Sequence, residues 1–325
     1  MNMLIFQRLR QLLSGTVGGL LLHVEDERDL VFGAVFKAAA YQPKNRVKSI
    51  KTLSVKNQQS FNTCTWNSAI LCKEFQEGKP LSVRFLVAAG REKGRIFGNG
   101  FASLRNSQQT LVEEGSCEET LCPDVKPDWN TYSSPSVLTY DAKMNAGEHK
   151  SQRYFLVQTL NDYMMCLDGD NIIQTGLEWY TGYNKFNVKE KCVLEPYTGV
   201  KVGGHAVACV GYDLDSGLLE FQNSFGEQYG NNGRFFVRIK DWFQMGFGGY
   251  VMVDVDNSQV IASYEGKDVK TSVGPGIYRI ESGKKRVYHS ADIFFKHGGR
   301  FGTDKTWQLI SANILNSIPE GSPME

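Results

Sequence analysis

The sequence has few histidines and no excess of charge of either sign. Five residues are histidine, and 36 basic against 35 acidic residues leave a formal net charge of +1 over 325 residues. A nearly neutral chain offers no broad attraction for a polyanion, so we expect no nucleic-acid partner. No apolar run approaches the roughly 18 to 20 residues that cross a bilayer, so we also expect no membrane span.

Signals for export and for metal binding are missing too. Arg8 and Arg10 follow the first apolar residues, the reverse of the order in a secretory signal, so we predict no signal peptide and a cytoplasmic location. The seven cysteines are odd in number and contain no CxxC pair, so we expect no zinc site, no other metal and no cofactor. Free, buried thiols are the expected state, although Cys117 and Cys122 could bridge in an oxidising compartment.

What is present points to a folded protein with helices first and strands later. The 19 Phe, 14 Tyr and 5 Trp exclude disorder over most of the chain. Hydrophobic periodicity predicts helices and then strands, which favours an α+β protein whose two halves meet at a cleft. The predicted helices are 1 to about 22, Asn67–Phe75, Ser103–Glu114 and Tyr154–Leu167, and the predicted strands are Ile172–Trp179, His205–Tyr212, Leu218–Asn223 and Phe235–Ile239.

Composition divides the chain into three parts. We predict an N-terminal helix and extended arm over residues 1–45, a main domain over 46–255 and a small β-rich docking module over 256–325. Short candidate strands in the last part are Ile277–Ile280, Lys285–Tyr288 and Trp307–Ile310.

Four residues of the main domain form a pattern suited to nucleophilic catalysis. Cys64 stands where a helix would begin, and a helix N-terminus together with an imidazolium turns a thiol into a thiolate. His205, within Gly203–Cys209 at the start of an apolar strand, is the one candidate base, and Asn223 would hold its ring in the working orientation. The Gln58 side-chain amide and the Cys64 N–H would stabilise an oxyanion.

These residues resemble the papain-like cysteine peptidases. The shared order is a Gln six residues before a Cys, then Gly-His-Ala, then Asn-Ser-aromatic-Gly, and the resemblance covers Leu53 to Val255. Cys64-Thr65 is similar to the bacterial and phage-type branch. The resemblance implies a two-lobed fold, with a helical left lobe and a β-barrel-like right lobe. It also implies a thiol protease that hydrolyses peptide bonds of a protein or peptide substrate through a Cys64 acyl-enzyme.

Other positions carry weaker expectations. Gly98, Asn99, Gly100 and Gly204 are candidate substrate-binding residues, with an ordinary loop as the alternative for the first three. The stretch before Cys64 is too short for the family's common helical prosegment, so latency of that kind is not expected. Cys64 is expected to be the most reactive of the seven thiols.

A second function stays open at this stage. The chain could be a structural or assembly component of a virion or tail, attached through its termini, that retains the papain fold. Catalysis would then be idle, or used in maturation or in cleaving cell-wall peptides. In that case the location would be virion-associated.

Overall fold

The computed structural model describes residues 19–21, 26, 29–47, 54–188, 190–253, 257–272, 274–310 and 312–325. The chain divides into two compact units, of which unit 1 holds residues 1–23 and 39–253 and unit 2 holds residues 24–38 and 254–325. The helix expected over 1 to about 22 lies outside the described residues, except that residues 20 and 21 form a strand. The predicted domain boundaries after 45 and 255 stay predictions.

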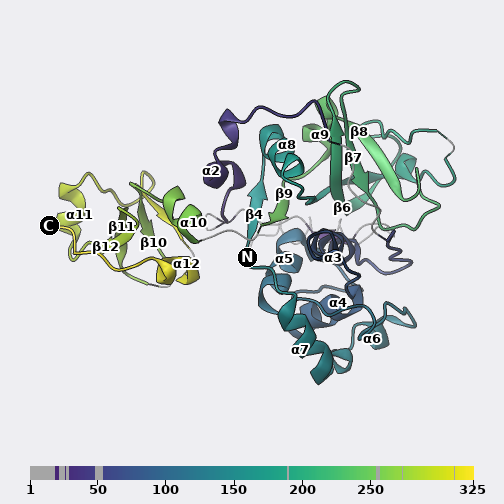
Figure 1. The fold of residues 1–325 in the computed structure, drawn as a ribbon, viewed down its shortest axis with the longest axis horizontal. Coiled ribbons are helices and arrows are strands. Elements are labelled where there is room, and N and C mark those ends of the chain that lie inside the picture. The colour runs from purple at the N-terminus through teal and green to yellow at the C-terminus, as the bar shows by residue number, and fades with distance from the viewer. Residues whose placement is uncertain are drawn as a thin grey trace. The chain divides into compact units, whose positions relative to one another are not determined.

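Helices gather on one side of unit 1 (Figure 1). The central helix α3 (Cys64–Glu77) is buried on all sides from Cys64 to Glu74, and it ends at Gly78, whose φ of 70° is left-handed. Against it pack α4 (Val83–Glu92) and α5 (Leu104–Glu113). Helix α6 (Trp129–Tyr132) joins the same core through its aromatic residues, and α7 (Tyr140–Glu148) packs on α4. The predicted helices at Asn67–Phe75 and Ser103–Glu114 are therefore confirmed, the first within a longer α3.

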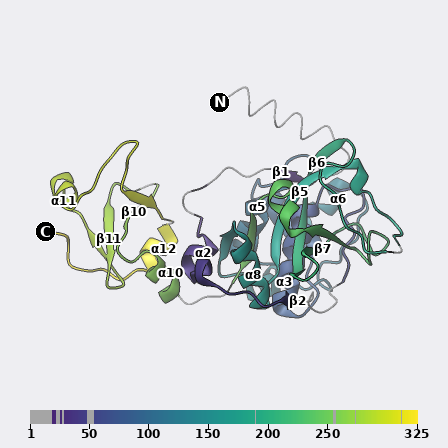
Figure 2. The same ribbon diagram turned by 90° about the horizontal axis from the view of Figure 1, so that it is seen from above.

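A seven-stranded sheet forms the other side of unit 1 (Figures 1 and 2). Its strand order is β4-β9-β5-β6-β7-β8, every neighbour is antiparallel, and β2 pairs with β6. The strands are β2 (Arg46–Val47), β4 (Tyr154–Val157), β5 (Ile173–Tyr180), β6 (Lys201–Asp213), β7 (Leu218–Gln222), β8 (Arg234–Arg238) and β9 (Gly249–Met252). The flanking helices are α8 (Leu160–Asp168) and α9 (Ile239–Met245), and the 3-10 turn η3 (Thr181–Tyr183) follows β5. A second 3-10 turn, η2 (Pro135–Val137), packs on α4, and η1 (Ala38–Ala40) spans the division between the two units in the sequence.

The two sides meet where α3 packs against β6. Their shared core includes Ile70 and Leu71 from the helix and Ala208 and Val210 from the strand. The predicted α+β architecture, with a helical and a β-rich lobe, is confirmed, and so are the four predicted strands of this unit, each within two residues except for the longer β6.

One predicted helix of unit 1 is wrong in its first part. Tyr154–Leu167 is divided into β4 and α8. Burial alternates along Tyr154–Val157, as on a strand. Thr159 and Asp162 then form a reciprocal capping box that starts α8.

Unit 2 contains a four-stranded sheet in the order β12-β11-β10-β13. Its elements are α2 (Phe32–Phe36), α10 (Asn257–Ser263), β10 (Asp268–Lys270), β11 (Ile277–Glu281), β12 (Lys284–Val287), α11 (Ala291–Lys296), β13 (Trp307–Leu309) and α12 (Ala312–Ser317). The three strands predicted for the C-terminal part are thus confirmed. Within the described ranges, no helix has both the length and the apolar character that crossing a membrane requires.

Candidate functional site

Cys64 is the first residue of α3, and a glycine-containing loop fixes the start of that helix. The Asn62 N–H donates to the Asn99 carbonyl at 3.0 Å, and the Trp66 indole N–H donates to the Gly100 carbonyl at 3.0 Å. Gly100 has a φ of 122°, and a Cβ there would lie 2.9 Å from the Asn62 carbonyl, so glycine is required for this approach. The predicted substrate loop therefore supports the helix end on which Cys64 lies.

His205 lies on β6 and is held by Asn223, the residue that follows β7. The distance from His205 Nε2 to Asn223 Oδ1 is 2.7 Å. The Ser224 N–H also donates to Asn223 Oδ1 at 2.7 Å, which identifies that atom as the amide oxygen. Because an amide oxygen only accepts, Nε2 carries the ring proton and Nδ1 keeps its lone pair. His205 Nδ1 is buried and has no hydrogen-bond partner among the described residues.

Two aromatic rings enclose the imidazole. The Phe225 ring centroid lies 4.6 Å from that of His205 at an interplanar angle of 32°, and the Trp179 centroid lies 4.6 Å away at 65°. The Trp179 indole N–H donates to Asn184 Oδ1 at 3.0 Å, which fixes its orientation. We did not anticipate Trp179 from the sequence. One feature of the sequence could have indicated it. Trp179 lies two residues after Leu177 on a predicted strand, so both side chains point to the same face, and this strand pairs with the strand of His205.

Gln58 connects the two lobes near these residues. Its backbone N–H donates to the Ser224 carbonyl at 2.8 Å, and its side-chain Oε1 accepts from Ser224 Oγ at 2.7 Å. Its Nε2 donates to the Phe61 carbonyl at 2.9 Å. An amide nitrogen carries two hydrogens, so this bond leaves one donor of Gln58 for another acceptor.

Residues Gly19–Leu21, here named the cleft segment, lie directly on Cys64. The Gly19 N–H donates to Cys64 Sγ at 3.0 Å, and the Gly19 carbonyl accepts from the Ala102 N–H at 2.9 Å. Strand β1 (Leu20–Leu21) continues this contact as a parallel partner of β3 (Ala102–Ser103). We did not expect this segment at the site, because we predicted residues 1 to about 22 as a helix.

Leu20 fills the space beside the thiol. It belongs to one buried cluster with Cys64, Leu104, Ala206 and Tyr250. Two glycines make room for it: a Cβ on Gly204 would lie 2.8 Å from the Leu20 carbonyl oxygen, and a Cβ on Gly176 would overlap the Leu20 side chain. Gly204, predicted to contact substrate, thus contacts the chain's own segment in this structure.

Neither the thiol nor the imidazole has solvent contact, since Cys64 lies beneath the cleft segment and His205 lies between Trp179 and Phe225. Burial raises the pKa of Cys64, against the lowering effect of the N–H groups of Ala206 and Gly19. Burial likewise lowers the pKa of His205 to about 4, although its bond to Asn223 acts in the opposite direction. The closed site therefore holds a neutral thiol and a neutral imidazole.

All seven cysteines, Cys117 and Cys122 included, are free and buried. Burial is the largest cause of a raised pKa at every one of them. We expected Cys64 to be the most reactive of the seven thiols. Because the cleft segment covers its sulfur, this reactivity requires that the segment first leaves the site. Among the residues that the structure describes, no three His, Cys, Asp or Glu side chains gather as metal ligands would.

The lowered pKa of His205 predicts that acid favours release of the cleft segment. A free histidine has a pKa near 6.5, whereas burial lowers the pKa of His205 in the closed site to about 4. Release of the cleft segment, which packs on the neighbouring Gly204, is expected to raise this pKa towards the free value. The stabilisation of the closed state is therefore complete above about pH 6.5 and is lost as the pH falls towards 4. In Cys64→Ala, where no thiol supplies the proton, the released fraction should rise by up to about tenfold per pH unit in this window.

Hydrogen exchange at the Ala102 amide, corrected for its intrinsic pH dependence, measures this release because that amide bonds to the cleft segment. The same chain with His205→Gln provides the control, since glutamine does not titrate, and its exchange should not change with pH beyond the intrinsic effect. A flat profile with His205 present would contradict the prediction.

Several solved structures with a similar fold are cysteine proteases. Xylellain, a cysteine protease from Xylella fastidiosa, matches with a TM-score of 0.61 and 20% identity over 74% of this chain and 97% of its own. ProCathepsin B S9 from Trypanosoma congolense matches at 0.53 with 14% identity over 76% and 88%. Procathepsin L 3 from the larval midgut of Tenebrio molitor matches at 0.51 with 13% identity over 66% and 72%. No family model and no curated protein sequence matches the chain. The chain has the papain-like cysteine protease fold.

Proposed function

We propose that the chain is a papain-like cysteine peptidase that hydrolyses peptide bonds through Cys64. In the structure its own residues 19–21 cover this cysteine and keep the active site closed. One arrangement carries this proposal. His205 presents an unpartnered Nδ1 while Asn223 holds its Nε2, and the N–H of the next residue, Ala206, donates to Cys64 Sγ at 3.4 Å.

Acylation begins once the cleft segment has left. His205 Nδ1 takes the proton of the Cys64 thiol, and the thiolate attacks the carbonyl carbon of the scissile bond. The carbonyl oxygen becomes an oxyanion, which accepts from the Cys64 N–H and from the free hydrogen of Gln58 Nε2. The imidazolium then gives its proton to the departing amine, and the acyl group stays on sulfur as a thioester.

Deacylation repeats these roles with water. His205 Nδ1 takes a proton from the attacking water, and the second oxyanion uses the same two donors. When the tetrahedral intermediate collapses, the carboxylic acid leaves and the proton returns to sulfur. Asn223 keeps the ring oriented throughout because its oxygen accepts from Nε2 in both the neutral and the charged state.

A thiol-directed peptidase inhibitor, with the modified residue identified by mass spectrometry, tests the proposal. The chain used is full-length Leu20→Arg, because a cation is not stable in the apolar site of Leu20. Labelling at Cys64 together with cleavage of an unstructured protein is the expected result. Folded protein that is labelled at Cys64 but cleaves nothing would favour the assembly role. That role, the bacterial or phage-type branch and the cytoplasmic or virion-associated location all stay predictions.

Removal of the oxyanion donor should slow catalysis without abolishing it. In the Leu20→Arg chain, Gln58→Ala is expected to lower kcat about 100- to 1000-fold, as loss of one such donor typically does. Peptide hydrolysis under saturating substrate measures the effect. Gln228→Ala exchanges an exposed glutamine and should leave kcat unchanged. An unaltered kcat in Gln58→Ala would remove Gln58 from the mechanism.

The closed site makes the full chain a latent form. Two neighbours in fold are named as proenzymes, proCathepsin B S9 and procathepsin L 3. In this chain Gly19 and Leu20 contact Cys64, through the bond of the Gly19 N–H to the sulfur and through the buried cluster that Leu20 shares with the thiol. Release of these residues would therefore control activity.

A further inference from the structure

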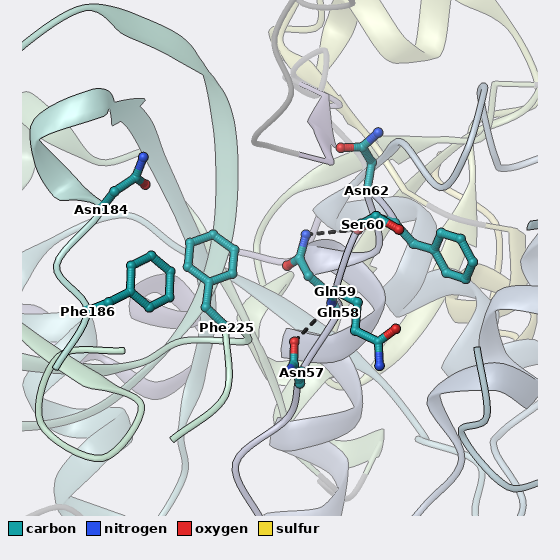
Figure 3. A pocket seen from close by; sticks show the side chains of 9 residues that line it. Asn57, Gln58, Gln59, Ser60, Asn62, Asn184, Phe186 and Phe225 are labelled. Atoms are coloured by element: carbon teal, nitrogen blue, oxygen red, sulfur yellow. Dashed lines mark hydrogen bonds between the residues drawn. The ribbon is translucent and has the colours of Figure 1, made fainter. Parts of the chain in front are cut away.

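The proposed reaction needs Cys64 and His205 at a fixed separation, although the two residues lie on different lobes. In the pocket shown in Figure 3, Gln58 lies opposite Phe225 and its bonds to the next lobe join the two sides. A second connection lies in the interior, where α3 packs against β5. It is made by the side chain of Gln174 on β5, which is fully buried.

Gln174 binds the first turn of α3 directly beside the nucleophile. Its Nε2 donates to the carbonyl of Thr65, the residue that follows Cys64, at 2.7 Å. Because a carbonyl only accepts, the atom that faces it is the amide nitrogen. The second hydrogen of this nitrogen has the Ser68 and Ser107 hydroxyls within reach, at 3.1 and 3.0 Å. Both hydroxyls donate to backbone carbonyls of their own helices, so both can accept from Gln174.

The amide oxygen of Gln174 is held as well. Gln108 on α5 donates from its Nε2 to Gln174 Oε1 at 2.6 Å. Gln108 is also fully buried, and its own Oε1 has no hydrogen-bond partner among the described residues. Buried amides that are only partly satisfied stabilise a fold less than apolar side chains of the same shape would. Stability alone therefore does not account for this pair of glutamines.

Gln174 lies on the strand that sets the position of the proposed base. Strand β5 pairs with β6 in one unbroken register over Ile173–Trp179, and Leu177 of this stretch lies opposite His205. Gln174 comes three residues before Leu177 on the same strand. Its bond to the Thr65 carbonyl thus joins the helical turn that carries the nucleophile to the pair of strands that carries the base.

We propose that Gln174 is a positioning residue for catalysis, which fixes the first turn of α3 against β5 and so keeps the Cys64 sulfur in reach of the His205 imidazole. Gln108 orients the Gln174 amide. The inference rests on the proposed peptidase function. An error of about 1 Å in the placement of a reacting group can slow a reaction about 100-fold, so the effect falls on kcat and not on the binding of substrate.

Removal of the amide in the full-length Leu20→Arg chain, in which Cys64 is open to labelling, tests this role. Gln174→Met keeps the length of the side chain and loses its hydrogen bonds. We expect it to lower kcat about 10- to 100-fold and to change KM less than about threefold. The pH dependence of Cys64 alkylation is the second readout. Its acid limb should move towards about pH 8.5, the ordinary thiol value, because the imidazolium no longer lies where it stabilises the thiolate.

A double variant separates positioning from stability. Gln174→Met combined with Gln108→Leu replaces both partners by apolar groups, which should recover most of the thermal stability lost in the single variant. Its kcat should stay low, because the Thr65 carbonyl still has no donor from β5. Gln76→Met is the matched control, since it removes a bond from the other end of α3 to the Met252 carbonyl on β9 and should leave kcat unchanged.

Failure of this inference is distinguishable from failure of the peptidase proposal. If the Leu20→Arg parent cleaves no peptide, the peptidase proposal fails, and the labelling profile alone decides on Gln174. An unchanged labelling profile in Gln174→Met overturns the inference, because the sulfur then keeps its place beside the imidazole without this amide. Recovery of kcat together with stability in the double variant also overturns it, since Gln174 would then act on stability alone.

Discussion

Full-length chain with Leu20→Arg is expected to react with a thiol-directed peptide inhibitor at Cys64 about 100-fold faster than the native chain. Leu20 is buried in one cluster with Cys64 and Tyr250. Removing a buried leucine costs about 1.5 to 3 kcal/mol, and placing a guanidinium there adds a desolvation penalty. Since 1.4 kcal/mol is a factor of ten in an equilibrium, the open population rises by about two orders of magnitude. Labelling rates at neutral pH measure it.

Leu121→Arg is the matched control, because Leu121 is exposed and does not line the cleft. It should label at the native rate. Gly19→Ala provides a second route to the open state, since a Cβ there would overlap the Asn62 carbonyl and force the segment away. Thermal unfolding of each variant checks that faster labelling is not loss of fold. If folded Leu20→Arg and Gly19→Ala both react as slowly as the native chain, the cleft segment does not control access.

The parts of the site predicted from the sequence are those with strong local signals. Cys64 is the first residue of a long buried helix, His205 lies on one strand of clear β character, and Asn223 directly follows the antiparallel neighbour of that strand. Their approach follows from the packing of α3 against β6. The order of these residues along the chain and the type of element that carries each were therefore enough to predict them as catalytic residues, without knowledge of any distance.

The cleft segment could not be found in this way. Gly19-Leu20-Leu21 follows the short run Ser14–Gly18, and two leucines alone show no period that separates a strand from the end of a helix. Its role depends on contacts with residues far along the chain, such as Gly176 and Gly204, which leave room for Leu20. A glycine in a strand signals a close approach but does not say by which segment.

Of the two rings that enclose the imidazole, Phe225 was expected there from its place after Asn223 and Ser224, whereas Trp179 was hidden for a similar reason. Trp179 is one aromatic residue among many on β-rich segments, and only the register of β5 on β6, which sets Leu177 opposite His205, brings its ring beside the imidazole. Asn184, which accepts the Trp179 indole N–H, lies in an irregular segment directly after η3. Irregular segments carry no periodicity from which a contact could be inferred.

Loss of either reacting group should abolish peptide cleavage. In the Leu20→Arg chain, Cys64→Ala and His205→Ala are each expected to lower kcat/KM by at least about 10⁴-fold, because the nucleophile and its base act as a unit. Cys192→Ala removes another buried thiol and His297→Ala an exposed histidine, and both should retain activity. Hydrolysis of a fluorogenic peptide measures all four.

The two losses are separable by the pH dependence of alkylation at residue 64. Cys64→Ala has no sulfur there and should not be labelled at any pH. His205→Ala keeps the thiol but lacks the imidazolium, so its labelling should rise only as the pH approaches about 8.5, the ordinary thiol value. With His205 present in the opened chain, labelling should already be fast well below that pH, because the imidazolium stabilises the thiolate. Identical profiles with and without His205 would show that the imidazole does not activate Cys64, and retained cleavage in Cys64→Ala would exclude the thioester mechanism.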